Sequence, residues 1–165
     1  MRKVLTGALV ALLAAGAAPA SASILGSDAA ACARGEPSVL VRVDGFKQRT
    51  GNLRVQVYGS NPAHFLAKGK KVARVDVPVT RAGRMDVCVA LPGPGQYAVA
   101  VRHDVEGNGK SGWNDGGGFS RNPSISLVHL KPDYRDVAIN VGDGVRALDV
   151  VLNYRRGLAI GPVKG

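Results

Sequence analysis

Seven short runs in this chain alternate their side chains with a period of two, and this pattern limits the possible folds more than any other feature. Successive side chains of a β-strand point to opposite faces, so each run can bury one face and leave the other outside. Turn sequences such as Asp44-Gly45 and Thr50-Gly51-Asn52 separate the runs. The pattern predicts an all-β fold, a seven-stranded antiparallel β-sandwich. The runs lie at residues 39–43, 53–57, 75–79, 87–89, 97–101, 137–141 and 148–154.

One short helical turn is expected between the second and third runs, from Pro62 to Ala67. Asn61 is a good N-cap, and Pro62 suits the first helical position because its missing N–H has no partner there. Gly69 then allows the turn to end.

The first 22 residues have the pattern of a secretory signal peptide. Arg2 and Lys3 give a positive start, an apolar run follows, and Ala20-Ser21-Ala22 provides small residues for cleavage after Ala22. The apolar run is shorter than the roughly twenty residues of a membrane span. We therefore expect a periplasmic or secreted protein that does not span a membrane once mature. The alternative is an uncleaved anchor.

The remaining residues suit one domain. We expect an extended N-terminal lead at 23–36, the β-sandwich at 37–156 and a flexible tail at 157–165. Cys32 and Cys88 are the only cysteines. In an oxidising compartment two cysteines most simply pair as a disulfide, although two independent buried thiols are the alternative.

The chain is basic, with a formal net charge of +10. Its few aromatic residues and its expected export argue against nucleic acid as a partner. Anionic envelope polymers or lipid head groups are the electrostatic partners that remain, and a solvated basic surface without a partner is the alternative. The tightest basic cluster is Lys68-Gly69-Lys70-Lys71.

The segment HDVEGNGKSGWNDGGGFSRN, residues 103–122, is too polar for a core and too rich in glycine for a helix, so it is predicted to be a loop. Long loops in small domains are often functional. Its spacing of Asp104, Glu106 and Asn108, with Asp115 at the twelfth position, partly matches a calcium loop. The alternative is an acidic turn whose carboxylates accept hydrogen bonds from backbone amides.

Three further side chains of this loop are binding candidates: His103, Trp113 and Phe119. His103 continues the inward face of its strand, which favours a packed ring bonded to the backbone or an acid over a catalytic base. Trp113 and Phe119 are either apolar anchors that hold the loop to the sandwich or, for Trp113, a platform for a sugar ring or a peptide.

Several blocks of the chain resemble the bacterial domain of unknown function 2141 family. The matching blocks are GNLRVQVYGSNPAHFL, LPGPGQYAVAVRHDVEGNGK and GGFSRN, which together span most of residues 37–154. The resemblance implies an exported immunoglobulin-like or prealbumin-like sandwich, and the family has no assigned activity. The family usually has a further acidic residue soon after Lys110, where this chain has Ser111-Gly112-Trp113.

These observations favour a non-catalytic binding or scaffolding module that acts through the 103–122 loop. Its partner is an unidentified envelope ligand, whether glycan, peptide or protein, and calcium is the one cofactor to consider. The chain contains neither G-x-S-x-G nor H-E-x-x-H. The alternative function is a hydrolase that uses His103, Asp104 and Glu106 of the same loop.

Overall fold

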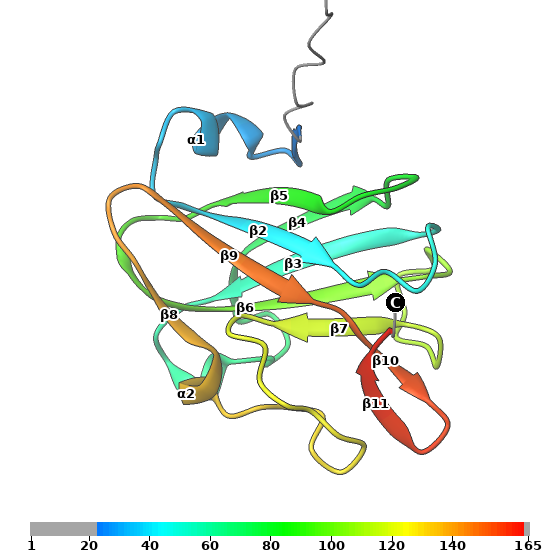
Figure 1. Cartoon of the computed structure of the whole chain (residues 1–165). Coiled ribbons are helices and arrows are strands. Elements are labelled where there is room, and N and C mark those ends of the chain that lie inside the picture. The colour runs from blue at the N-terminus through cyan, green and yellow to red at the C-terminus, as the bar shows by residue number, and fades with distance from the viewer. Residues whose placement is uncertain (1–22, 164–165) are drawn as a thin grey trace, which may run out of the picture.

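A computed structural model describes residues 23–163, and the predicted signal peptide at 1–22 lies outside these residues. Two sheets face each other, with the apolar sides of their strands between them (Figure 1). Sheet A contains, in spatial order, β1 (Ile24–Leu25), β5 (Met85–Ala90), β2 (Ser38–Asp44) and β9 (Val145–Val151).

Sheet B is larger and entirely antiparallel. Its spatial order is β11 (Ala159–Pro162), β10 (Asn153–Arg156), β7 (Gly116–Phe119), β6 (Gly95–Asp104), β3 (Asn52–Tyr58) and β4 (Lys71–Pro78). A further strand, β8 (Ala138–Val141), pairs with the first residues of β6.

The predicted all-β sandwich is confirmed, and the structure adds detail that the alternation could not provide. The described residues form eleven strands rather than seven, and β2 pairs with β9 in parallel. The run predicted at 148–154 is two strands, because the chain leaves sheet A after Val151 and enters sheet B at Asn153. Alternation continues through this crossing, so the sequence pattern does not reveal it.

The core consists of the inward residues of both sheets. Val39, Val41 and Val43 of β2 face Leu53, Val55 and Val57 of β3, and all six are fully buried. Tyr97 closes one end of the core, and its hydroxyl donates a hydrogen bond to the carbonyl of Gly93, 2.7 Å away. This tyrosine bond fixes the Pro-Gly-rich turn before β6, as tyrosine corners do in other sandwiches.

Short helical elements cover the outer faces. Of the helical turn predicted from Pro62 to Ala67, the structure forms η1 (Pro62–His64), and the Asn61 side chain accepts a hydrogen bond from the backbone N–H of Ala63. A four-residue helix that the sequence did not indicate, α2 (Tyr134–Val137), packs on sheet B through an apolar cluster with Ala98 and Phe65.

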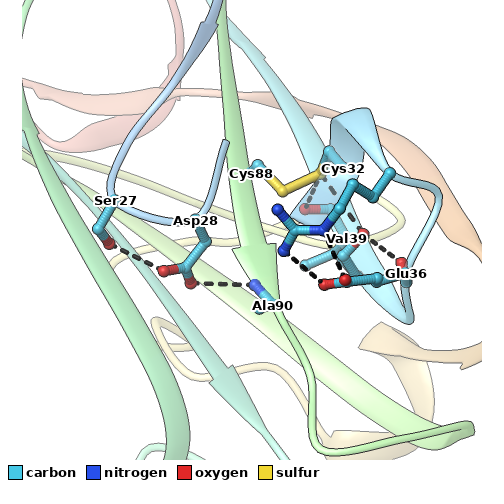
Figure 2. Close-up of a disulfide and its surroundings, with 9 residues drawn as sticks. Ser27, Asp28, Cys32, Glu36, Val39, Cys88 and Ala90 are labelled. Atoms are coloured by element: carbon cyan, nitrogen blue, oxygen red, sulfur yellow. Dashed lines mark hydrogen bonds and ion pairs between the residues drawn. A yellow bond between two sulfur atoms is a disulfide. The ribbon is translucent and has the colours of Figure 1, made fainter. Parts of the chain in front are cut away.

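The N-terminal lead is not simply extended. It forms β1, which pairs with β5, and then α1 (Ala29–Ala33). Cys32 of α1 forms a disulfide with Cys88 of β5, with Cα atoms 6.1 Å apart, and the Asp28 carboxylate accepts a hydrogen bond from the backbone N–H of Ala90 (Figure 2). The lead is therefore fastened to the outer face of sheet A.

Four residues of the predicted flexible tail, 159–162, instead form β11 at the edge of sheet B. Sequence reasoning missed this strand because its four residues, Ala-Ile-Gly-Pro, include two that normally interrupt strands.

We expect the Cys32→Ala/Cys88→Ala double variant to fold with a lower free energy of unfolding, by about 4 kcal/mol, because the bridge closes a loop of more than fifty residues in the unfolded chain. Urea unfolding of the oxidised protein, the reduced protein and the variant measures the difference. Two alkylatable thiols in the native, oxidised protein would contradict the bridge.

Candidate functional site

The segment 103–122 is only partly a loop. Strand β6 continues through Asp104, residues 105–115 form the connection, and Gly116–Phe119 form β7, which pairs with both β6 and β10. The polarity and glycine content of the segment predict a loop throughout, and they do not indicate that its glycines form a strand paired between two others.

The glycines of β7 are required by the side chains that cross them. A Cβ atom at Gly116 would overlap the ring of Tyr154, and one at Gly118 would overlap the Val150 side chain. Chain 150–154 is the segment that passes from sheet A to sheet B. This segment can lie this close to β7 only because Gly116 and Gly118 have no side chains.

His103 is fully buried beneath this crossing, with 0% of its surface exposed. Its Nε2 lies 2.8 Å from the carbonyl oxygen of Thr50, which can only accept, so Nε2 holds the proton. Its Nδ1 then accepts a hydrogen bond from the Tyr154 hydroxyl, 2.6 Å away. The packed interpretation of His103 agrees with this geometry, and no ring nitrogen is left for a ligand.

Burial lowers the pKa of His103, and it raises the pKa of Tyr154 to about 12. Both groups therefore remain uncharged at neutral pH, as a buried pair without a counter-ion must. The pair links β6 to β10, two strands of sheet B that lie on either side of β7.

The carboxylates of the connection bind backbone amides. Asp104 accepts from the N–H groups of Asn108 and Gly109, at 3.2 and 2.7 Å. Asp115 accepts from Val105 and Gly112, at 3.1 and 2.9 Å.

Glu106 accepts from the side-chain amide of Asn108, 2.8 Å away. Within residues 23–163, no three His, Cys, Asp or Glu side chains are grouped so that they could hold a metal ion. All four residues proposed for calcium form hydrogen bonds within this connection, and calcium binding by them stays a prediction.

The GFSRN block also connects elements. The Ser120 hydroxyl donates to the carbonyl of Val137 and accepts from the N–H of Val99. Asn122, at a left-handed φ of 46°, accepts from Val151 N–H and donates to Asp149 carbonyl, so its amide pairs with the free edge of β9. These residues hold α2 and β9 against sheet B.

Trp113 lies apart from these structural residues. Its side chain is 71% exposed, and the guanidinium carbon of Arg155 stacks 3.3 Å from its ring centroid. Beside it is a groove of about 430 Å³. The groove is mainly apolar, and its apolar lining consists of Trp113, Phe119, Ile125, Leu127, Leu130 and Ile160.

Phe119 is both an apolar anchor and part of the groove lining. It packs against Phe65 at a centroid distance of 6.0 Å, and it also lines the groove. Sequence reasoning missed the other walls, which come from the 125–130 segment and the β10–β11 hairpin. The alternating apolar residues Ile125 and Leu127 in a stretch without a predicted element were the one available signal.

The chain belongs to the family described as an uncharacterised protein conserved in bacteria, DUF2141, whose model matches residues 41–149. The match covers β3 to β8 and most of β2 and β9 but ends before the β10–β11 hairpin, so Arg155 and Ile160 of the groove lie outside it. No curated protein and no solved structure matches the chain. In residues 23–163, neither helix approaches the length that crossing a membrane requires.

The buried His103 predicts a pH dependence of stability. An unfolded histidine takes up a proton near its ordinary pKa of 6.5, whereas the native ring does so only at lower pH. The unfolded state therefore binds more protons below pH 6.5, and acidification favours unfolding. We expect the free energy of unfolding to fall between pH 6.5 and 5, measured by urea titration. The free energy of unfolding of His103→Gln should depend less on pH over this range. Equal pH dependence of the variant and the wild type would contradict the lowered pKa of His103 in the native protein.

The bonds of Asp104 predict that its replacement destabilises the protein without involving calcium. Asp104→Asn replaces one acceptor oxygen with an amide group, and we expect a loss of about 1–3 kcal/mol. The loss should be the same in calcium and in a chelator, because backbone amides already satisfy the carboxylate. Thermal unfolding in both buffers measures this. A wild-type midpoint that rises with calcium, and does not rise in the variant, would instead support the calcium hypothesis.

Proposed function

We propose that this chain is an exported, non-catalytic binding module that captures an extended peptide segment with apolar side chains in the Trp113 groove. The observation that most favours this is the lining itself. Aliphatic and aromatic side chains from three separate segments converge beside an exposed tryptophan, and exposed apolar concavities of this kind are typical of binding sites.

A peptide is favoured over a sugar because the polar groups at the groove already have partners. Both carboxylate oxygens of Asp115 accept backbone N–H groups, and the Asn153 amide donates to the carbonyls of Gly117 and Val151. Few groups remain for sugar hydroxyls. One face of Trp113 is covered by Arg155, which leaves the other face for an apolar side chain.

The non-catalytic part of the proposal is supported by the residues of the hydrolase alternative. His103 has both ring nitrogens bonded inside the protein, and Asp104 is buried against backbone amides. A general base needs a nitrogen or oxygen within reach of a substrate proton. The export of the module is supported by the signal-peptide pattern at 1–22.

Trp113 is the single tryptophan of the chain, so its fluorescence reports on the groove alone. We expect a displayed peptide library to yield sequences with apolar residues, and their binding to shift Trp113 emission to shorter wavelength. Leu130→Ser, inside the groove, should weaken binding about tenfold or more, as loss of a central apolar contact does.

Val128→Ser is the matched control, because Val128 is 97% exposed and does not line the groove. It should change the affinity by no more than about twofold. Equal weakening by both variants, or a library that yields no apolar sequence, would refute the peptide site. Binding to a glycan array that depends on Trp113 would replace the peptide with a sugar.

A further inference from the structure

The outer face of sheet B has a second concave region, which is basic rather than apolar. Arg54 of β3 and Arg102 of β6 are direct cross-strand partners, and Val55 and Val101, the next pair, point into the core. Like charges directly opposite each other on a sheet are unfavourable. Two arginines in this position therefore need a compensating interaction.

The arginines lie in a hollow of about 700 Å³ between two connections of the chain. Residues 66–69 form one wall, and Gly109 and Ser111 form the other. Five cationic residues line this basic hollow, and no described residue of the lining is Asp or Glu. The five are Arg54, Lys68, Lys71, Arg74 and Arg102.

Neighbouring groups hold the three guanidinium groups in place. Asp76 accepts from Nε of both Arg54 and Arg74, so one carboxylate serves two guanidinium groups. Burial favours a higher pKa for Asp76, but these hydrogen bonds outweigh it and hold the pKa below its usual value.

Arg102 donates to the carbonyl of Gly109 and to the hydroxyl of Ser111, at 3.0 and 3.1 Å. Its nearest carboxylate is that of Asp104, 3.7 Å away, which is buried and bonded to backbone amides. Lys68 and Lys71 form no ion pair within residues 23–163. The hollow thus combines three guanidinium groups that neighbouring groups hold in place with two lysines that form no ion pair within residues 23–163, which leaves an excess of positive charge.

We propose that the basic hollow binds a soluble ligand with several phosphate groups, such as an oligophosphate chain. Guanidinium groups match phosphate oxygens with paired hydrogen bonds, and lysines add charge without fixed direction. The hollow is larger than one phosphate group needs, and its five cations fit several. Its concave shape between two connections admits a chain or small molecule more readily than a flat bilayer.

Inorganic tripolyphosphate is the probe, titrated into the protein by calorimetry at low ionic strength. We expect Lys68→Gln/Lys71→Gln to weaken binding about tenfold, through the loss of two ion pairs. The matched control, Lys131→Gln/Arg146→Gln, removes the same charge from exposed residues outside the hollow and should weaken binding less than about twofold. Equal melting temperatures of the variants check that both remain folded.

Trp113→Ala should bind tripolyphosphate as the wild type does, which separates this site from the peptide groove. Equal weakening by the lysine pair and the control pair would show non-specific charge attraction and overturn the proposal. No detectable binding of tripolyphosphate would do the same. Co-sedimentation with phosphatidylglycerol vesicles that depends on Lys68 and Lys71, in the absence of tripolyphosphate binding, would overturn it in favour of a membrane surface.

Discussion

The close passage of one chain segment over another is the constraint on which this sandwich depends. Residues 150–154 cross from sheet A to sheet B directly over the glycines of β7, where side chains would collide. The space released by these glycines accepts the Tyr154 ring, and its hydroxyl completes the hydrogen bonds of the buried His103. The two sheets are therefore in close contact where the chain passes from β9 to β10 (Figure 1), and the neutral Tyr154–His103 pair links β10 to β6 within sheet B.

The most distinctive motifs of the chain form hydrogen bonds or close contacts within the protein. His103 and Asp104 form hydrogen bonds with backbone groups, and so do Ser120 and Asn122. The glycines of β7 let the 150–154 segment pass close to their backbone. Functional candidates lie around them, on surfaces that these motifs position. Arg155 reaches Trp113 only because the crossing places β10 beside β7.

The outer face of sheet B is divided into two regions with different chemistry. The groove beside Trp113 is apolar, the hollow above β3 and β4 is basic, and Ser111 of the 105–115 connection lines both. A single segment thus separates two candidate sites, and Asp104 and Asp115 at its two ends accept hydrogen bonds from backbone N–H groups within it. The 103–122 segment therefore contributes residues to both the groove and the basic hollow, but other segments contribute at least half of the lining of each.

The sequence by itself determined the all-β fold and the helical turn at Pro62, and it favoured the pairing of Cys32 with Cys88, because alternation, capping residues and the number of cysteines are local or countable properties. It also indicated Trp113 and the 103–122 segment. The tertiary structure alone decided that Gly116–Phe119 are a strand, that 148–154 divide between two sheets, and that Arg54, Lys68 and Arg102 share a hollow. These features depend on contacts between residues far apart in the chain, and no local pattern encodes which distant backbone will lie against a glycine.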